Sequence, residues 1–231
     1  MVKRGVSRQL GAPPVQKLPL TVEILLKLHS LLDMSCTVDL SFWAAVLTGF
    51  FGLLRKSSLL PKTANCDFTM CLLRSDIVVM ERDSFVLQIR KSKTNQFGQR
   101  ILQLPFSACV DNILCPVFAM LRHLAGSKMA PDVPLFSCLI VGKVFHMTHA
   151  TFVSKLKKCL ERLGYPSAAY SGHSLRRGGC SFCYEAGLNA VEIKLRGDWK
   201  SMAFERYLFV SREKQFESSR MLADRTAFYL R

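Results

Sequence analysis

Apolar residues recur at helical spacing along most of the chain. Thr21 has the side chain of a helix N-cap, and apolar positions follow the helical period from there to about Asp33. A second segment, which Asp39 could cap, runs to about Leu54 and is apolar on every side. A helix of that composition has no face to turn to water, so we expect it at the centre of the core.

The hydrophobic period changes to two in a short central stretch. Phe85, Leu87 and Ile89 alternate with polar residues and are expected on one face of a strand. We predict three strands, at 76–80, 85–90 and 101–104. Helical spacing then returns after Pro105. We predict helices at about 114–124, 149–163, 174–187, 189–196, 201–208 and 212–223. Along the chain, helices come before and after one small antiparallel sheet, and this order indicates a mainly α fold of the α+β class.

The length and the N-terminal composition suggest one domain behind a short arm. A chain of 231 residues can bury a proper core but has no room for two full-sized domains. Residues 1–17 combine basic side chains with Gly and Pro and contain no apolar segment, which is typical of an arm or linker. We therefore expect the domain to occupy residues 18–231, without a secretory signal before it.

The charge balance points to a polyanionic partner. Lys and Arg number 32 against 17 Asp and Glu, a formal net charge of +15. A hydrophobic content of 49% with 16 Phe excludes a disordered basic tail, so the charge must lie on a folded body. Nucleic acid is the first expectation and an anionic membrane the second, although the longest uncharged run, 40–54, is too short to span a bilayer. Nine Cys, an odd number, favour reduced thiols and exclude an ordinary disulfide framework.

Residues 171–179, Ser-Gly-His-Ser-Leu-Arg-Arg-Gly-Gly, carry the most chemistry. His173 and Arg176 are three positions apart, so at the start of a helix they share a face with free N–H groups that favour an anion. Taken alone, the pair favours a second interpretation over this anion site, namely a capping His and a solvated Arg. Arg55 strengthens the first interpretation, because a charge at the end of an apolar helix is costly unless it is paired or binds a ligand.

Six residues in order resemble the catalytic domain of the tyrosine recombinases, also called phage-type integrases. The resemblance extends from about residue 18 to 225 and implies that family's fold. The six positions are Arg55, Lys93 in the basic segment 91–100, His173, Arg176, Trp199 in Gly-Asp-Trp, and Tyr207.

The resemblance implies a role for each of these residues. Tyr207 is the nucleophile that forms a 3′-phosphotyrosyl bond and releases a 5′ hydroxyl. The two Arg residues stabilise charge on the phosphate oxygens, which an enzyme without metal or nucleotide cofactor needs. Lys93, or Lys91 as the alternative, protonates the leaving 5′ oxygen. His173 assists proton transfer at the tyrosine, and Trp199 donates a hydrogen bond from its indole N–H to the phosphate.

Two features depart from the family's usual pattern. Ser58 stands where an acidic residue commonly follows the first Arg by three positions, which removes an orienting carboxylate. Tyr207 follows Trp199 by eight positions, one fewer than in most bacterial members. The short interval and the Gly-Asp-Trp-x-Ser wording look most like the recombinases of the eukaryotic DIRS, Ngaro and Crypton mobile elements.

Basic side chains beyond the six are candidates for contacts with the duplex. We expect them to bind backbone phosphates, although a solvated helix face is the alternative for those between 155 and 162. They are Lys91, Arg90, Arg100, Lys155, Lys157, Lys158, Arg177 and Lys200. The pairs Cys180/Cys183 and His146/His149 have spacings seen in metal sites, but neither has a partner pair, so we expect buried thiols and no metal.

The sequence thus predicts an enzyme that breaks and rejoins double-stranded DNA as a homotetramer on two DNA sites. It would use no cofactor, membrane or small-molecule substrate, and would be located in the nucleus, or in the nucleoid of a prokaryote. Relatives carry a DNA-clamping domain before the catalytic one, so the chain is expected to be a fragment or to use a clamp supplied elsewhere. The segment 211–223 could pack on a neighbouring subunit.

Two alternatives remain open, a DNA-binding derivative without activity and a type IB topoisomerase. The main interpretation requires one spatial arrangement: Arg55 and Arg176 close around one phosphate, with the Tyr207 phenol directed at it.

Overall fold

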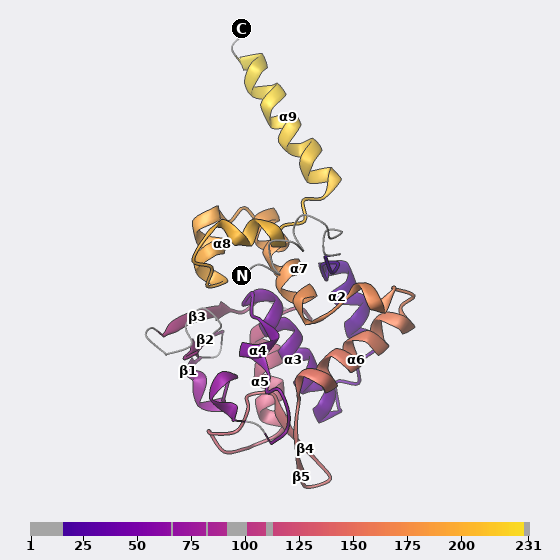
Figure 1. Ribbon diagram of the computed structural model, residues 1–231, viewed down its shortest axis with the longest axis vertical. Helices are drawn as coiled ribbons and strands as arrows, with labels where there is room; N and C mark the ends of the chain where they lie inside the picture. Colours follow the sequence, from indigo (N-terminus) through magenta and orange to yellow (C-terminus); the bar gives the residue numbers. More distant parts are fainter. Residues whose placement is uncertain (1–15, 66, 82, 92–100, 110–112, 229–231) are drawn as a thin grey trace, which may run out of the picture.

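Helices make up most of the described chain, and two small sheets interrupt them (Figure 1). The computed structural model describes residues 16–65, 67–81, 83–91, 101–109 and 113–228. The α-helices are α2 (Val22–His29), α3 (Thr37–Phe51), α4 (Lys56–Leu59), α5 (Pro116–Gly126), α6 (His149–Arg162), α7 (Gly172–Glu185), α8 (Ala190–Arg196) and α9 (Arg212–Phe228). The 3-10 helices are η1 (Phe68–Met70), η2 (Arg74–Asp76), η3 (Ser167–Ala169) and η4 (Met202–Tyr207). The strands are β1 (Ile77–Met80), β2 (Ser84–Ile89), β3 (Leu102–Ser107), β4 (Ser137–Ile140) and β5 (Lys143–His146). The predicted class, mainly helical with a three-stranded antiparallel sheet, is confirmed.

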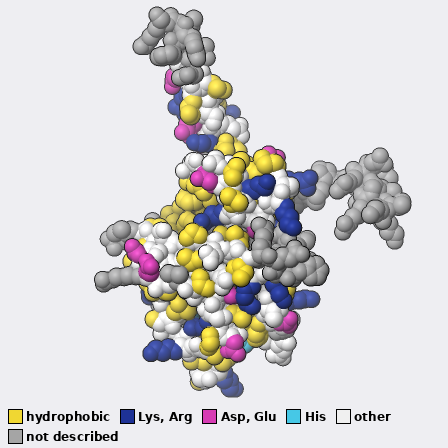
Figure 2. Space-filling view, turned by 90° about the vertical axis from the view of Figure 1, so that its left-hand side faces the viewer, with side chains coloured by type: hydrophobic (Ala, Val, Ile, Leu, Met, Phe, Trp, Pro, Cys, Tyr) yellow, Lys and Arg dark blue, Asp and Glu magenta, His cyan; other side chains and the backbone are white. Residues whose placement is uncertain are grey.

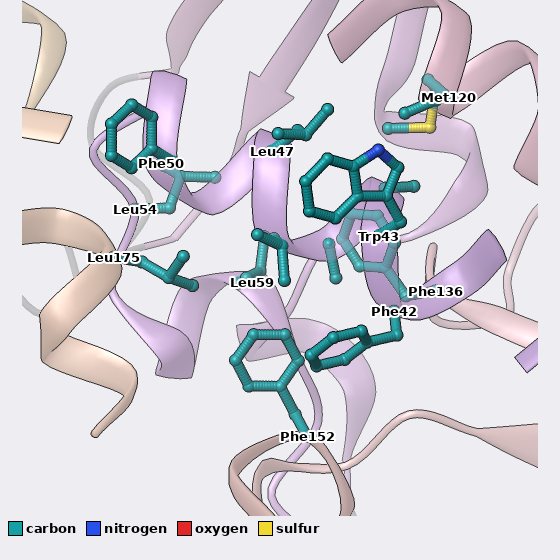
Figure 3. Close-up of a cluster of buried hydrophobic side chains, with 14 of the residues drawn as sticks. Phe42, Trp43, Leu47, Phe50, Leu54, Leu59, Met120, Phe136, Phe152 and Leu175 are labelled. Atoms are coloured by element: carbon teal, nitrogen blue, oxygen red, sulfur yellow. The ribbon is translucent and has the colours of Figure 1, made fainter. Parts of the chain in front are cut away.

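The apolar helix α3 runs through the centre of the molecule, as its sequence predicts. It packs against α5, α7 and β4, and nearly all of its side chains are buried. Figure 3 shows Phe42, Trp43, Leu47 and Phe50 of this helix inside the main core, with Phe42 against Phe152 of α6. Because α5, α7 and β4 pack around α3, they fix the position of this helix in the molecule.

The start of α2 agrees with its predicted cap, whereas the start of α3 does not. The Thr21 hydroxyl accepts a hydrogen bond from Ile24 N at 3.2 Å. Cys36 is the N-cap of α3, so the prediction that Asp39 caps this helix was wrong. Asp39 lies in the first turn, where its carboxylate accepts from Asp33 N at 2.9 Å and pairs with Lys155 Nζ at 2.6 Å. An acidic residue in the first turn still suits the positive end of the helix dipole.

The three-stranded sheet has the order β1-β2-β3, with both pairs antiparallel. Alternate residues of β2 are buried, and Phe85 stacks on its cross-strand partner Phe106 with ring centroids 4.5 Å apart. Strand β3 continues through Pro105 to Ser107, beyond the predicted end at residue 104. Proline has no backbone N–H to donate to a neighbouring strand. It is tolerated at position 105 because β3 is an edge strand, which pairs with another strand on one side only.

The β4–β5 hairpin is an element that the sequence did not predict. Its turn consists of Val141 and Gly142, with φ of +46° and +76°. A hairpin turn of this kind usually contains Asn or Asp before Gly, and a β-branched residue there is unusual. The apolar run before Gly142 therefore lacked both the alternation and the turn signal of a hairpin.

The two ends of the described chain differ in how they meet the rest of the protein. Most of the predicted arm 1–17 lies outside the described residues, but Leu18 N donates to Ala169 O at 2.9 Å and Leu20 is wholly buried. Helix α9 extends away from the other elements (Figure 1), and its Phe216 and Leu222 are exposed. Within the described part of the chain, no helix has the length and apolar character that a membrane crossing would require.

A buried histidine should make the fold sensitive to acid. His123 donates from Nε2 to Leu135 O at 2.8 Å, which leaves Nδ1 to accept from the Ser41 hydroxyl at 3.0 Å. Burial lowers the pKa of His123 from 6.5 to about 4. Between those values the unfolded chain binds more protons, so the free energy of unfolding should fall as pH drops from 6.5 to 4, by about 3 kcal/mol from this group.

Denaturant unfolding at pH 7 and pH 4.5 measures this loss, and His123→Asn is the comparison. The variant should be less stable at pH 7 but should lose less stability on acidification. Equal losses in both proteins would contradict the assignment to His123.

Candidate active site

The turn after α3 places Arg55. The helix ends at Phe51, and Gly52 follows where an added Cβ would lie 2.7 Å from Thr48 O. Leu53 then adopts a φ of +51°, and Arg55 is the N-cap of α4. Arg55 therefore lies just past the C-terminal end of α3, although that helix is buried along its length.

Helix α7 crosses the same end of α3 at very short range. Ser171 caps α7, accepting from His173 N at 3.2 Å, while Ser174 Oγ accepts from Ser171 N at 3.0 Å. Two glycines face the neighbouring backbone: a Cβ on Gly178 would lie 1.8 Å from Leu20 O, and one on Gly179 would lie 2.0 Å from Phe50 O. This close approach places Arg176, which precedes the two glycines on α7, at the end of α3.

Arg176 is buried, with only 2% of its surface exposed, and is the centre of the site. Its Nη1 donates to Leu53 O and its Nη2 donates to Gly197 O at 2.6 Å. The guanidinium carbon lies 3.7 Å from the centroid of the Trp199 ring and 5.4 Å from that of Tyr207. The two rings are themselves 5.3 Å apart. One arginine and two aromatic side chains, distant in the sequence, thus form a single stacked group.

The electrostatics of this group favour an anion. Burial, and then the neighbouring charge of Arg55, lower the pKa of Arg176 to about 9, while Tyr207 acts in the opposite direction. Among the residues that the structure describes, no carboxylate pairs with Arg55 or Arg176, and Arg176 Nε is buried without a hydrogen-bond partner. Two cations that destabilise each other would both be stabilised by a phosphate between them.

A narrow pocket separates the two arginines. Its lining includes Arg55, Ser58, Arg176, Arg196 and Asp198, and its volume is about 20 Å³. That is room for about one water molecule, so a phosphodiester requires the pocket to widen. Ser58, which replaces the family's acidic residue, is buried and donates its N–H to Arg55 O at 2.9 Å.

Arg196 is part of the site and was not identified from the sequence. Its Nε donates to Phe51 O at 2.5 Å, its Nη2 donates to Pro105 O at 3.4 Å, and it lies over the Phe106 ring. Arg176 and Arg196 therefore both bind carbonyls of the turn that carries Arg55, at the negative end of the α3 dipole. Its only sequence signal was a basic residue directly before Gly197-Asp-Trp.

The remaining predicted catalytic residues have different outcomes. His173 is exposed and lines a second pocket together with Tyr207. Lys93 lies outside the described residues, so its role stays a prediction, while the alternative Lys91 is half-buried. The structure thus brings together Arg55, Arg176, Trp199 and Tyr207, with His173 next to Tyr207.

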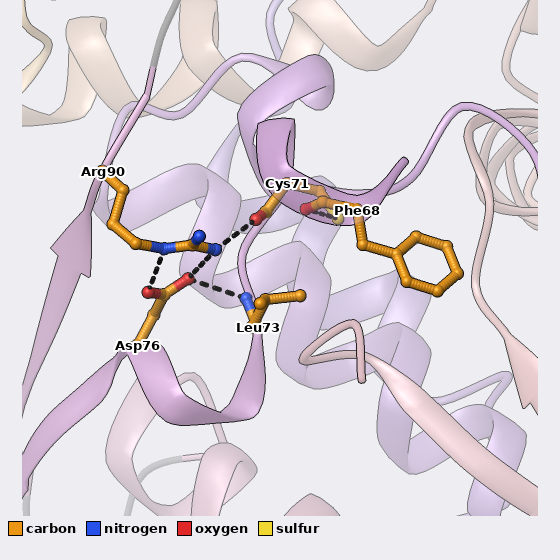
Figure 4. Close-up of polar contacts among 5 residues, drawn as sticks. All are labelled: Phe68, Cys71, Leu73, Asp76 and Arg90. Carbon is orange, nitrogen blue, oxygen red and sulfur yellow. Dashed lines mark hydrogen bonds and ion pairs between the residues drawn. The ribbon is translucent and has the colours of Figure 1, made fainter. Parts of the chain in front are cut away.

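The residues predicted to contact DNA vary in their surroundings. Lys and Arg side chains are spread over the face in Figure 2, with fewer Asp and Glu among them. Arg90 forms a two-point ion pair with Asp76, at 2.6 and 3.0 Å, and also donates to Cys71 O (Figure 4). Lys155 is paired with Asp39, whereas Lys158 and Lys200 are exposed. Lys157 is half-buried and Arg100 lies outside the described residues.

The two pairs with metal-like spacing, Cys180/Cys183 and His146/His149, have different surroundings in the structure. Cys180 and Cys183 are buried free thiols in a second core cluster with Trp199. His146 Nδ1 lies 2.7 Å from Ser137 Oγ, and His149 Nε2 lies 3.0 Å from Leu60 O. In the described ranges, no three His, Cys, Asp or Glu side chains converge as metal ligands.

Gly197 holds Trp199 against Arg176, which predicts a specific loss. A Cβ at position 197 would lie 1.7 Å from Cζ3 of the Trp199 ring, so Gly197→Ala must displace the indole from the guanidinium. We expect the DNA cleavage that the resemblance implies to slow by about 100-fold, because misplaced charge-stabilising groups cost that much. Single-turnover cleavage measures the effect, with Gly126→Ala in α5 as the control, where the added Cβ would meet only the side chains of Leu40, at 3.2 Å, and Thr37, at 3.9 Å. Unchanged cleavage in Gly197→Ala would show that the indole position is irrelevant.

Comparisons with known proteins agree with this geometry at the level of the fold. No family model matches the sequence, and no curated protein is significantly similar to it. Several solved structures match over most of the chain, and three of them illustrate the range. The XerH site-specific recombinase bound to palindromic difH substrate is 14% identical, with 88% of this chain and 53% of that chain covered and a TM-score of 0.57. The Tn1549 transposon integrase with a circular intermediate DNA is 15% identical, with 95% and 69% covered and a TM-score of 0.62. The Flpe–Holliday junction complex is 15% identical, with 86% and 47% covered and a TM-score of 0.51.

The protein is similar to these structures along nearly its whole length, although it spans only about half the length of XerH. The matched proteins are tyrosine recombinases, and the same fold here brings together four residues of the predicted catalytic set. The chain therefore has the fold of the catalytic region of site-specific tyrosine recombinases.

Proposed function

We propose that this protein breaks and rejoins DNA as a site-specific recombinase, through a 3′-phosphotyrosyl intermediate. One observation carries the proposal: the Tyr207 ring lies against Arg176, whose guanidinium shares a pocket with Arg55. The matched XerH and Flpe structures contain DNA, a difH substrate and a Holliday junction, which supports DNA as the substrate class.

In the proposed reaction, the Tyr207 phenol oxygen attacks the scissile phosphorus and gives up its proton through His173, to which the resemblance assigns this proton transfer. The bond between phosphorus and the 5′ oxygen breaks, and that oxygen takes up a proton, which the resemblance assigns to Lys93. The new ester keeps the energy of the phosphodiester, so another 5′ hydroxyl can reverse the step without ATP.

The arginines supply fixed charge to this reaction. Arg176 Nε is a buried donor without a partner among the described residues, so it is the atom we expect to meet a phosphate oxygen first. The terminal nitrogens of Arg176 donate to Leu53 O and Gly197 O, which holds the group in place before DNA arrives. A preorganised donor costs no reorganisation when charge develops on the oxygens.

The finer assignments are part of this proposal. The resemblance of the Gly197-Asp-Trp segment supports a mobile element of the DIRS, Ngaro or Crypton kind, and with it a nuclear location. We propose a homotetramer on two DNA sites, in which α9 packs on a neighbouring subunit. Its extended position and exposed Phe216 and Leu222 support that role (Figure 1).

A nicked suicide substrate tests the proposed chemistry. Its short 5′ product diffuses away after cleavage, so the covalent complex is trapped and can be mapped by proteolysis and mass spectrometry. We expect a DNA adduct on the peptide that contains Tyr207. DNA binding without any adduct would instead identify an inactive DNA-binding derivative, and relaxation of a plasmid without a specific site would favour a topoisomerase.

A further inference from the structure

A second basic pocket lies next to Tyr207 and is lined by none of the residues of the Arg55 pocket. Its volume is about 260 Å³, far larger than the pocket between Arg55 and Arg176. Its lining residues come from the N-terminal segment, from α7 and from η4, and none of them is acidic. They are Gln16, Lys17, His173, Arg177, Arg206 and Tyr207.

Hydrogen bonds between distant segments build this pocket. Arg177 Nη1 donates to Gln16 Oε1 at 2.5 Å and to Lys17 O at 3.1 Å, which fixes the N-terminal segment along α7. Lys17 Nζ donates to Ala168 O at 2.7 Å. His173 and Arg177 are one turn apart on α7, so both side chains project from the same face of the helix.

The positive charge in the pocket has no counter-charge within the described chain. No carboxylate of the described residues pairs with Lys17, Arg177 or Arg206. Arg177 Nε is also buried without a hydrogen-bond partner. A buried donor without a partner, inside a concave cluster of cations, is stabilised when an anion fills the site.

We propose that this pocket binds the DNA backbone phosphate next to the scissile phosphate, on the cleaved strand. The inference rests on the proposed function, because it places the scissile phosphate between Arg55 and Arg176. The Tyr207 ring centroid lies 5.4 Å from the Arg176 guanidinium carbon, and Tyr207 also lines the second pocket, so this one side chain adjoins both sites. Arg176 and Arg177 are consecutive on α7 and serve one site each.

The strand that enters the first pocket must continue past Tyr207, and its next phosphate is only one nucleotide away. Binding that phosphate fixes the position of the strand along α7. Arg177 and Arg206 are then positioning residues, which hold the phosphorus in line with the Tyr207 oxygen without touching it.

The test combines charge removal on the protein with charge removal on the DNA. Arg177→Gln and Arg206→Gln each remove a cation, and substrates with a neutral methylphosphonate at one position at a time remove single phosphate charges. Binding and single-turnover adduct formation are both measured. Lys143→Gln, an exposed charge on β5 at the other end of the molecule (Figure 1), is the matched control.

For the intact protein, methylphosphonate at the phosphate adjacent to the cleavage position should weaken binding by about 10- to 100-fold. Each Arg variant should lose a similar factor on natural DNA but lose little more on that modified DNA, because the same contact is already absent. Lys143→Gln should keep the full sensitivity. Additive losses at that position in both Arg variants would overturn the proposal.

The measurement of DNA binding tests this inference independently of the proposed function. A protein that binds DNA but forms no adduct would refute the enzymatic proposal, and binding to the modified DNA would still decide whether the pocket holds this phosphate. A protein that shows the same methylphosphonate sensitivity at every position would overturn the assignment of the pocket to one phosphate.

Discussion

Tyr207→Phe should abolish covalent attachment to DNA while leaving the fold intact. The substitution removes one oxygen and keeps the ring, which contacts Trp199 and Arg176 in a partly buried position. Without the phenol oxygen no phosphotyrosyl bond can form, so adduct formation should fall by at least about 10⁴-fold, as expected for the loss of a nucleophile. Denaturing gels of the trapped complex with labelled suicide DNA measure the loss.

Tyr184→Phe is the control for this prediction. Tyr184 also packs against the second core cluster, but it is not among the residues that line either arginine pocket. We expect this variant to form the adduct at the normal rate. A full yield of adduct in Tyr207→Phe would move the nucleophile to another tyrosine and would refute the assignment.

Gly179→Ala should destabilise the fold strongly. The added Cβ would lie 2.0 Å from Phe50 O and 2.7 Å from Leu53 Cδ2. The carbonyl belongs to the backbone of a buried helix and cannot rotate away, so α7 and α3 must separate. We expect the free energy of unfolding to fall by more than about 3 kcal/mol, a large part of the stability of a single domain. Denaturant titration followed by circular dichroism measures this change.

Gly172→Ala, in the same helix, is the matched control. Its Cβ would meet only the side chain of Lys56, at 3.0 Å, and a lysine side chain can move aside. This variant should stay within about 1 kcal/mol of the parent, apart from the helix-propensity gain that alanine brings. Equal stability of Gly179→Ala and Gly172→Ala would show that α7 has room to move away from α3.

Local features of the fold were predictable because neighbouring residues decide them. The cap at Thr21, the all-apolar helix α3, which ends at Phe51 and not at about Leu54, and the alternation of β2 each depend on residue type and spacing over a few positions. Where a local signal was weak, the prediction failed. The β4–β5 hairpin turns at Val141, and the predicted helix at 201–208 is the 3-10 helix η4.

The site was predictable in its residues more than in its geometry. The sequence shows five of the predicted catalytic residues in the family's order, and the resemblance supplied their roles. They are Arg55, His173, Arg176, Trp199 and Tyr207. The contacts of Arg196 with Phe51 O and Pro105 O were not predictable, because hydrogen bonds to carbonyls far away in the chain leave no pattern in the residue types.

The sequence by itself determined which groups are available: a basic surface on an apolar core, a helical framework, and the side chains of a phosphoryl-transfer site. The tertiary structure decided which of them meet. Gly178 and Gly179 allow α7 to touch the backbone at Leu20 and Phe50, and this contact places Arg176 beside Arg55 and under the Trp199 and Tyr207 rings. Distances between residues far apart in the chain depend on packing, which is a property of the whole fold and not of any local segment.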